Sequence, residues 1–349
     1  MRNFPIKLNI PMPDDWHLHL RSGEMLSKVL PYTSQHFARA IVMPNLPSPV
    51  LTRNDALIYR QEILSYLPKG EDFTPLMTLY MTENTDPNEV RLGFLKGEVS
   101  AVKLYPAGAT TNSDAGVKDL EKIYSVLEVM EEIAMPFLVH GEVVDANIDI
   151  FDREAVFIET KLIPIRQRFP KLKIVFEHLT TKEGVDYVLS CDQNTAATIT
   201  PHHLVINRNA MLVGGIKPHY YCLPVAKREL HRLALVKAAT SGDARFFLGT
   251  DSAPHLTTAK ESDCGCAGIF NVANAVAVVT QLFENENALE QLEKFLSING
   301  ANFYQLPINK QRLNLERFNE SQPIPEDIKT AEGIVKAFDP MMDVYWKVV

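Results

Sequence analysis

The sequence predicts an α/β protein whose parallel strands close into a (β/α)8 barrel, the TIM-barrel fold. Short apolar runs rich in β-branched residues alternate with longer amphipathic segments along almost the whole chain, which indicates βαβ units and a parallel sheet. Eight such runs match the strand number of a closed barrel. An open doubly wound sheet is the competing architecture, but it usually needs a glycine-rich first turn, and no GxGxxG follows the early runs.

Each expected strand is a short apolar run, and the expected helices lie between them. The strands are predicted at 16–18, 40–43, 76–81, 101–104, 137–139, 174–176, 196–199 and 246–248. The helices are predicted at 52–67, 86–96, 118–134, 152–169, 182–189 and 226–239, which are amphipathic segments.

The length of the chain fits this fold as a single domain. Its 349 residues would make about two average domains, but barrels with insertions run from ~200 to over 400 residues as one domain. No Ser/Gly-rich linker, low-complexity tract or internal repeat divides the chain. We therefore predict one domain over residues 1–349, with a short C-terminal appendage after about residue 300.

Composition excludes several classes of partner. Lys and Arg number 35 against 43 Asp and Glu, a formal net charge of −8, so the chain lacks the bulk positive charge that grips nucleic acid or anionic lipid. Four cysteines fit a reducing compartment, and no stretch resembles a signal peptide or a membrane span. We expect a cytoplasmic protein that binds neither nucleic acid nor membrane.

Five expected strands end in side chains that can bind a metal or titrate. They are His17 with His19, Lys103, His140, His178 and Asp251. Taken singly, each has an ordinary structural explanation, such as a hydrogen-bonded histidine or a turn aspartate. However, Lys103, His140 and His178 follow one another at 37 and 38 residues, about one βα unit each. This shared phase predicts one site at the C-terminal ends of the strands, where barrel active sites are built.

The residue types fit a centre of two metal ions. His17 and His19 are two residues apart, so on a strand both imidazoles point the same way and offer two nitrogen ligands to one cation. An ammonium at Lys103 would repel cations, and a salt-bridged structural lysine is the alternative. Burial lowers the pKa of a lysine, however, and its neutral amine can react with carbon dioxide to form a carbamate. Carboxylated Lys103 could then bridge two metals ~3.5–4 Å apart.

Six motifs connect these residues to a known family. They are DDWHLHLR at 14–21, MPN at 43–45, KLYPA at 103–107, HGE at 140–142, FEH at 176–178 and GTDSAPH at 249–255. Together they resemble the dihydroorotases, in particular the bacterial single-function type, within the amidohydrolase superfamily. The resemblance covers nearly the whole chain and fades after about Tyr304. It implies a homodimer that reversibly hydrolyses the cyclic amide of (S)-dihydroorotate to N-carbamoyl-L-aspartate, the third step of de novo pyrimidine (UMP) biosynthesis.

The resemblance also implies roles for individual residues. Two Zn²⁺ ions per subunit would be held by His17, His19 and Asp251 and by His140 and His178, with carboxylated Lys103 bridging them. The catalytic residue would be Asp251, which accepts the proton of the attacking water and passes it to the leaving amide nitrogen. Substrate would be bound by His19, Arg21, Asn45, His140, Leu223, His255 and Ala267. Of these, Arg21, Asn45 and His255 would hold the exocyclic carboxylate, while Leu223 and Ala267 would contact the ring through their backbone.

The loop after Lys103 is expected to cover the site. Residues 106–116 are small and polar and can bury little surface, so we predict a loop that is mobile when the site is empty. It would close over bound substrate, with Thr110 and Thr111 donating hydrogen bonds and excluding water. The alternative is an ordinary connector between a strand and a helix.

Two other functions stay open. A dihydropyrimidinase-like or hydantoinase-like cyclic-amide hydrolase would share the core but would not need Arg21, Asn45 and His255 together. A non-catalytic scaffold would be expected to lack Lys103, Asp251 or the HxH pair, and all are present.

The other histidines and the cysteines receive plainer interpretations. His36, His203 and His231 are expected at the surface or at helix caps, and His202 and His219 near the loops of the site face. Cys222, Cys264 and Cys266 could suggest a thiolate site, but they supply three thiols, where a structural zinc usually takes four ligands.

Overall fold

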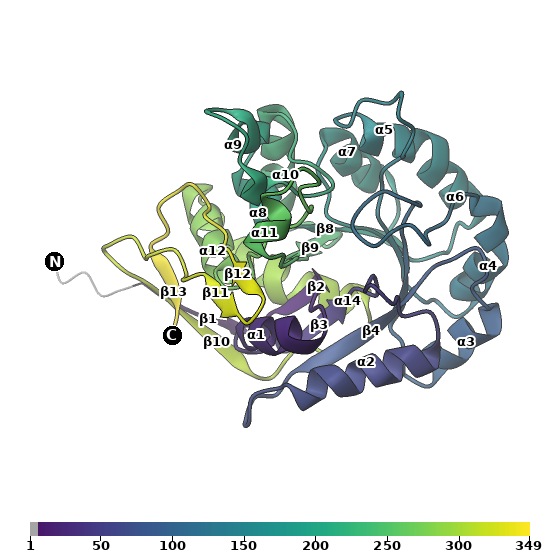
Figure 1. Ribbon diagram of the computed structural model, residues 1–349, viewed down its shortest axis with the longest axis horizontal. Coiled ribbons are helices and arrows are strands. Elements are labelled where there is room, and N and C mark those ends of the chain that lie inside the picture. The colour runs from purple at the N-terminus through teal and green to yellow at the C-terminus, as the bar shows by residue number, and fades with distance from the viewer. Residues whose placement is uncertain (1–5) are drawn as a thin grey trace.

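The computed structural model describes residues 6–349, and within them eight parallel strands form a barrel surrounded by helices (Figure 1). The barrel strands are β2 (Asp14–Leu18), β3 (Arg39–Val42), β4 (Thr74–Tyr80), β5 (Ala101–Leu104), β6 (Phe137–Val139), β7 (Ile174–Phe176), β8 (Thr195–Ile199) and β9 (Phe246–Leu248). They pair in sequence order, each parallel to the next. The predicted barrel is confirmed, and the eight predicted strands coincide with β2–β9 to within two residues at either end.

Hydrogen bonds between β2 and the chain just after β9 close the barrel. The backbone N–H of Asp251 donates to the carbonyl of His17 at 2.7 Å. The buried carboxylate of Asp15 accepts from the backbone N–H of Thr250 at 2.8 Å and from its hydroxyl at 2.5 Å. These bonds hold the first and last barrel strands in register where the metal-binding candidates lie.

An apolar layer fills the floor of the barrel. Its fully or almost fully buried members are Trp16, Ile41, Met43, Ala101, Leu138, Val175, Ala196 and Phe247. Below it, Tyr304 stacks on Trp16 with ring centroids 4.4 Å apart. Successive side chains of a strand alternate between its two faces, so the inward-facing positions above this floor include Asn45, Lys103 and His140. The candidate site therefore rests on a packed floor.

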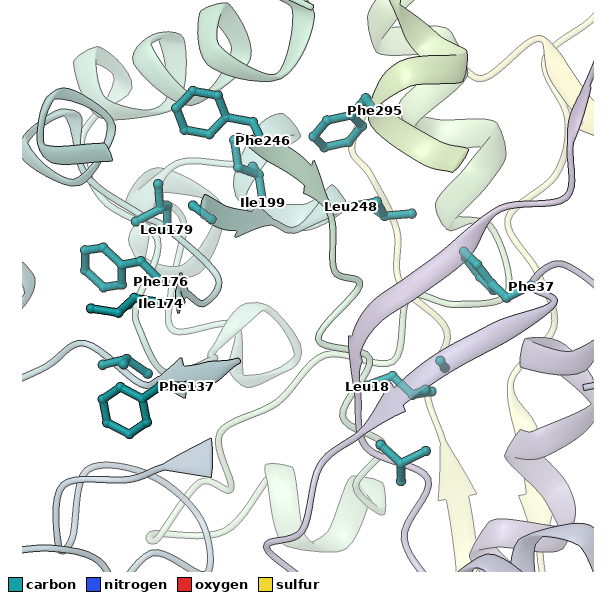
Figure 2. Close-up of a cluster of buried hydrophobic side chains, with 14 of the residues drawn as sticks. Leu18, Phe37, Phe137, Ile174, Phe176, Leu179, Ile199, Phe246, Leu248 and Phe295 are labelled. Carbon is teal, nitrogen blue, oxygen red and sulfur yellow. The ribbon is translucent and has the colours of Figure 1, made fainter. Parts of the chain in front are cut away.

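The outward faces of the strands carry the larger hydrophobic core. Figure 2 shows Phe137, Phe176, Ile199 and Phe246 directed from successive strands toward the surrounding helices. All four side chains are almost completely buried. Burying a side chain of this size stabilises the fold by about 1.5–3 kcal/mol, so this layer holds the helices against the barrel.

The helices that follow the strands are mostly those predicted, with local departures. The α-helices are α1 (Gly23–Ser34), α2 (Arg53–Ser65), α3 (Pro87–Leu95), α4 (Tyr124–Glu132), α5 (Arg153–Phe157), α6 (Ile163–Arg168), α7 (Lys182–Ser190), α8 (Pro201–Val205), α9 (Arg208–Leu212), α10 (Glu229–Thr240), α11 (Thr257–Lys260), α12 (Ala275–Asn285), α13 (Leu289–Glu293) and α14 (Asn299–Phe303). Wider or tighter turns are η1 (Leu120–Ile123), η2 (Ile158–Leu162), η3 (Pro218–Tyr220) and η4 (Lys294–Ile298).

The departures have physical causes. The helix predicted at 152–169 is interrupted by the π-turn η2, and the one predicted at 118–134 opens with the 3₁₀ turn η1 before α4 begins. The sequence did not reveal α12, because eight of its eleven residues are buried and a helix buried nearly all round shows no clear amphipathic period. It also did not reveal α1, which contains Pro31, a residue that normally ends a helix.

The segment after α14 packs back onto the barrel. Its strands are β10 (Arg312–Arg317), β11 (Ile328–Thr330), β12 (Gly333–Val335) and β13 (Trp346–Val348). β10 lies between β13 and the early strand β1 (Lys7–Pro11), both antiparallel to it. Figure 1 shows this small sheet beside the barrel. Within residues 6–349, no helix is long and apolar enough to cross a membrane.

The floor of the barrel leads to a stability prediction at Gly300. A β-carbon at this position of α14 would lie 2.0 Å from Nε1 of Trp16, closer than atoms can approach. We expect Gly300→Ala to lower the free energy of unfolding by about 1–3 kcal/mol, the usual cost of overpacking a core. Urea denaturation followed by fluorescence measures the change.

The matched control is Asn302→Ala, which adds no bulk to the core because Asn302 is exposed in the same helix. This variant is expected to be as stable as the parent. Equal stability of Gly300→Ala and the parent would show that Trp16 can move aside at no cost.

Candidate metal centre and active site

The predicted metal-binding residues converge above the barrel floor. His17, Lys103, His140 and His178 are at most 2% exposed. Ring centroids of His17 and His178 lie 5.0 Å apart, and those of His140 and His178 lie 4.8 Å apart. Asp251 completes the group from the end of β9, and its Oδ1 lies 3.3 Å from Nε2 of His17. The structure thus brings together side chains that are far apart in sequence.

Three residues at the rim of this cluster have an unusual backbone. Arg21, His178 and Asp251 have φ angles of +60°, +41° and +45°, in the left-handed region that residues with a side chain rarely adopt. Such backbone persists when the surroundings enforce it, and it is concentrated at functional sites. The three residues follow β2, β7 and β9, at the strand ends where the cluster lies.

One subset of the cluster has the geometry of a cation site. The donor atoms of His17, His19 and Asp251 all lie within 4.8 Å of one another, and Nε2 of His19 is 3.1 Å from Oδ1 of Asp251. Burial lowers the pKa of His19 to about 4, so its imidazole is neutral and offers a lone pair. Burial opposes ionisation of Asp251, but the neighbouring His17 and His19 hold the pKa of that carboxyl well below its usual value. The neutral imidazole of His19, the imidazole of His17 and the carboxylate of Asp251 form a ligand set suited to zinc.

Lys103 lies at the centre of the cluster and is completely buried. Among residues 6–349, its Nζ atom has no hydrogen-bond partner. Burial lowers the pKa of its amine to about 8, an effect that Glu177 and Asp251 oppose. An unpartnered buried amine is costly, and a lowered pKa increases the fraction of the neutral, reactive form. Both observations fit a lysine that is carboxylated and bridges cations.

Two glutamates that the sequence analysis did not single out hold the imidazoles in place. Oε2 of Glu177 lies 2.8 Å from Nδ1 of His17 and also accepts the hydroxyl of Thr198 at 2.6 Å. Oε2 of Glu142 lies 3.0 Å from Nε2 of His140. A carboxylate on one ring nitrogen fixes the tautomer and leaves the other nitrogen free for a cation. Their signal was their place inside HGE and FEH, next to predicted ligands.

A cavity opens above the cluster and is lined by most of the residues predicted to bind substrate. The predicted residues in its wall are His17, His19, Arg21, Asn45, Thr110, Thr111, His140, His178, Leu223, Asp251 and Ala267. Tyr105 and Cys222 line it as well. Lys103 and His255 do not line this wall: Lys103 is completely buried, and His255 contacts Arg21.

Arg21 and Asn45 line this cavity, and His255 contacts Arg21. Nη2 of Arg21 donates to Nε2 of His255 at 2.9 Å, and its Nε donates to the Pro254 carbonyl at 3.1 Å. Burial, and to a lesser extent the Arg21 charge, lower the pKa of His255 to about 2, so this imidazole is neutral and accepts from the guanidinium. Among the described residues, no carboxylate pairs with Arg21 by an ion pair, which leaves its charge available to a carboxylate ligand.

The loop that follows β5 lies against this pocket. The side-chain amide of Asn45 donates to the carbonyl of Thr111 at 3.0 Å, and that of Asn112 donates to the carbonyl of Asn45 at 3.1 Å. Within the loop, the backbone N–H of Thr110 donates to the Ser113 hydroxyl at 2.9 Å. The two threonines therefore stand over the site, held by a few hydrogen bonds; their role as a lid stays a prediction.

The expectations for the other histidines need correction in part. His203 is 2% exposed, so its placement at the surface was wrong: its ring lies between Thr200 and the Pro224 carbonyl. His231 does cap a helix, since its Nδ1 accepts the backbone N–H of Lys182 at the start of α7. His36 is half-buried. Cys222 and Pro224, which lie outside the helix of His203, contact its ring, and no local sequence pattern reveals such contacts.

His202 and His219 lie at different depths of the site face. His202 is completely buried, and its Nδ1 accepts from the amide of Asn271 at 2.8 Å. That amide also donates to the carbonyl of Thr250, next to Asp251. His219 is nearer the surface, where its Nε2 lies 2.7 Å from Glu261. Asn271 thus connects His202 to the backbone next to Asp251, which fits a supporting role for His202 at the site.

The cysteines do not form a thiolate cluster of their own. Among residues 6–349, the ligand-type group that contains Cys222 is completed by His202 and His203, whereas Cys264 and Cys266 belong to no such group. Burial raises the pKa of Cys222 to about 12, and its thiol donates to the Pro224 carbonyl at 3.3 Å. Cys222 is therefore a neutral, hydrogen-bonded wall residue.

Comparison with known proteins identifies the class to which this fold and site belong. The amidohydrolase family model matches residues 14–314. The chain belongs to the amidohydrolase family.

Its relatives narrow this assignment. It is 59% identical over 342 residues to a dihydroorotase of Sinorhizobium medicae, which covers 98% of this chain and 99% of the relative, and 57% identical to one of Chelativorans over similar shares. A solved dihydroorotase from Campylobacter jejuni has 34% identity and a TM-score of 0.90, covering 100% and 99% of the two chains. Within the family the chain is thus a dihydroorotase.

More distant structures share only the fold. An L-hydantoinase (dihydropyrimidinase) from Arthrobacter aurescens superposes with a TM-score of 0.77 over 98% of this chain and 83% of its own, but at 14% identity.

The ring support from Glu177 can be tested directly. Glu177→Gln keeps the shape of the side chain but removes the charge that orients His17, so we expect the affinity for metal to fall about 10–100-fold. Metal content after dialysis against a graded chelator measures this loss. Glu98→Gln is the matched control, because that carboxylate pairs with Arg53 away from the site. Unchanged metal retention in Glu177→Gln would rule out the orienting role.

Proposed function

We propose that this dihydroorotase is zinc-dependent and hydrolyses the ring amide of (S)-dihydroorotate to N-carbamoyl-L-aspartate reversibly, as a step of pyrimidine synthesis. The observation that carries the proposal is that two features meet at one cavity: a buried cluster of cation ligands around Lys103, and the guanidinium of Arg21. Among residues 6–349, the Lys103 amine has no hydrogen-bond partner and no carboxylate forms an ion pair with Arg21. The first suits hydrolysis of an amide, and the second suits a substrate that carries a carboxylate.

The proposed cofactor is two Zn²⁺ ions per subunit. His17, His19 and Asp251 would hold one ion and His140 and His178 the other, with carboxylated Lys103 between them. When bound, such ions lower the pKa of water toward ~7 and polarise a carbonyl oxygen. The neutral imidazoles of His19, His140 and His178, the ionised carboxyl of Asp251 and the Lys103 amine, unpartnered among residues 6–349, support this assignment.

Asp251 is the residue proposed to move the proton. Hydrolysis forms a bond from water oxygen to the ring carbonyl carbon and breaks the bond from that carbon to the ring nitrogen. The water loses a proton and the leaving nitrogen must gain one, and a single carboxylate can perform both transfers in turn. Asp251 is ionised and lines the cavity, so it can accept the proton first and donate it afterwards. In the reverse direction the same transfers close the ring.

Substrate orientation is assigned to the other wall of the cavity. Arg21 and Asn45, backed by His255, would bind the exocyclic carboxylate, since a guanidinium binds a carboxylate through paired hydrogen bonds. The backbone of Leu223 and Ala267 would contact the ring. A dihydroorotase from Saccharomyces cerevisiae, 31% identical with a TM-score of 0.89 over 98% of each chain, was solved in complex with 5-fluoroorotic acid. That ligand is a pyrimidine with a carboxylate, which supports this assignment.

The loop with Thr110 and Thr111 is proposed to act as the lid. Both residues line the cavity, and the loop reaches Asn45, a proposed carboxylate ligand, through two hydrogen bonds. Binding of substrate to Asn45 would therefore affect the hydrogen bonds that join Asn45 to this loop. The family relation also supports a homodimer that works in the cytoplasm, and both remain predictions; light scattering tests the first.

Substrate choice tests the proposal through Arg21. The parent should turn over L-dihydroorotate far better than dihydrouracil, which lacks the carboxylate. Arg21→Met should lower kcat/KM for L-dihydroorotate roughly ten- to more than a hundredfold, because a charge-assisted hydrogen bond to the substrate is lost. This factor corresponds to about 1.5–3 kcal/mol of transition-state binding. Activity on dihydrouracil should barely change.

Arg60→Met is the control, since Arg60 is exposed on α2, and it should leave both activities unchanged. Equal loss on both substrates in Arg21→Met would make Arg21 a structural residue. A parent that hydrolyses dihydrouracil or hydantoin better than L-dihydroorotate would favour the hydantoinase-like alternative.

The bridging lysine is tested by removal and replacement. Lys103→Ala should lose bound metal and lose activity by at least about a hundredfold, since it removes a direct ligand whose supporting groups alone are worth that much. Short carboxylic acids should restore part of the activity by occupying the vacated bridge. Metal content and turnover are measured on the same samples.

Lys173→Ala is the control, because Lys173 precedes β7 at the opposite end of the barrel, where its amine donates to the Phe303 carbonyl. Two tightly held metals and full activity in Lys103→Ala would overturn the carboxylated bridge.

A further inference from the structure

A buried lysine outside the metal cluster has no role in the chemistry described so far. Lys260, the last residue of α11, is 3% exposed. Its Nζ donates to three backbone carbonyls, those of Tyr221 at 2.7 Å, Cys266 at 2.8 Å and Gly268 at 2.7 Å. Among residues 6–349, no carboxylate forms an ion pair with this ammonium.

Such an arrangement is expensive for the fold. An ammonium taken out of water loses its hydration, and carbonyl dipoles compensate only in part. Burial accordingly lowers the pKa of Lys260 to about 8, which leaves it mostly protonated at neutral pH. An apolar side chain would cost less if stability were the only requirement, so the position of the three carbonyls requires an explanation.

The three carbonyls belong to two segments that form one wall of the cavity. One segment runs from Tyr221 to Leu223, and the other runs from Cys266 to Gly268. The cavity is lined by the last two residues of each segment, which are Cys222, Leu223, Ala267 and Gly268. The segments also touch directly, because the N–H of Gly268 donates to the carbonyl of Tyr221 at 3.0 Å. Lys260 therefore joins, from behind, the two backbone segments proposed to contact the substrate ring.

The contact between Lys260 and the carbonyl of Cys266 fixes the direction of the next N–H group, that of Ala267. In a trans peptide the C=O and N–H point in opposite directions. Since the carbonyl of Cys266 points at Lys260, the N–H of Ala267 in the same peptide points away from Lys260. Within the described residues, that N–H donates to no backbone acceptor. A free donor on a cavity-lining residue is available to a carbonyl oxygen of a bound ring.

The same wall supports the carboxylate pocket. A β-carbon on Gly268 would lie 2.8 Å from Cδ2 of His255 and 2.7 Å from the carbonyl of Ala253, so the chain passes His255 at the closest distance that glycine allows. His255 in turn accepts from Arg21. Displacement of the 266–268 segment would therefore disturb His255 as well as the ring contact.

We propose that Lys260 is a positioning residue that locks the segments 221–223 and 266–268 together, so that their backbone groups face the pyrimidine ring in binding geometry. This inference rests on the proposed function, since it takes the ring of dihydroorotate as the ligand. Lys260 touches neither substrate nor metal. It acts on binding of the ring, which is separate from the proton transfer at Asp251.

The test is a split between KM and kcat. Lys260→Met keeps the length of the side chain and removes the three donors. We expect KM for L-dihydroorotate to rise roughly ten- to a hundredfold, the effect of losing one or two aligned hydrogen bonds. Contacts made equally in the ground and transition states change KM and leave kcat, so kcat should change less than about threefold and metal content should stay the same. The affinity for orotate, measured by calorimetry, should fall in parallel.

Two further variants complete the design. Lys260→Arg retains the charge and several donors and should recover most of the affinity for orotate. Lys173→Met, at the opposite end of the barrel, should match the parent in KM, kcat and orotate affinity. If Lys260→Met does not fold, Lys260→Gln, which keeps two donors without the charge, takes its place and should show a smaller rise in KM.

The outcomes separate the two proposals. A parent protein without turnover of L-dihydroorotate would refute the proposed function and not the positioning role of Lys260. If the parent is active and a folded Lys260→Met has unchanged KM and unchanged affinity for orotate, the positioning role of Lys260 is overturned. So would a loss confined to kcat with depleted metal, because it would place the action of Lys260 on the metal cluster.

Discussion

Only every second side chain of a barrel strand faces inward, and the arrangement of this molecule depends on that constraint. The apolar floor residues Met43, Ala101 and Leu138 are each followed two positions later by a polar residue of the site, namely Asn45, Lys103 and His140. The alternation that fills the floor therefore also directs Lys103, within β5, and His140, directly after β6, toward the site. Because the floor is close-packed, the site above it inherits its rigidity, which is what metal ligands require to keep a fixed geometry.

The side-chain cluster is held by strand ends, whereas the wall of the cavity that faces it is built from loops. The cluster stands on strand ends and on carboxylates such as Glu177 that fix imidazole tautomers. The opposite wall is built from loop backbone, held by Lys260 from behind and covered by the segment with Thr110 and Thr111. In the proposed function, residues at the strand ends carry out the reaction and loop residues bind the substrate. Such a division lets a barrel keep the groups at its strand ends while its loops vary.

The sequence predicted the parts of this structure that follow from local pattern. Eight strands and the phase of the ligands could be derived, because apolar runs and residue spacing are visible in one dimension. Glu142 and Glu177 lay within recognised motifs, but their hydrogen bonds to His140 and His17 depend on which ring nitrogen faces which strand. Lys260 carried no signal at all, since its partners are carbonyls, which every residue possesses. The burial of His203 was missed for a related reason, because it is imposed by segments remote in sequence.

The pairing of β10 with β1 has a consequence for how the chain folds. One edge of β1 stays uncovered until residues 312–317 have been synthesised, and the segments after β9 gain their last partners from Val335 and Ala337, which pair with Leu256 and Phe270. Lys260 lies between those two anchor points in the sequence. During translation the barrel strands can therefore assemble in order while the wall behind the substrate is still incomplete. A nascent chain could therefore assemble the side-chain cluster at the strand ends before residues 335–337 fasten the segments on either side of Lys260.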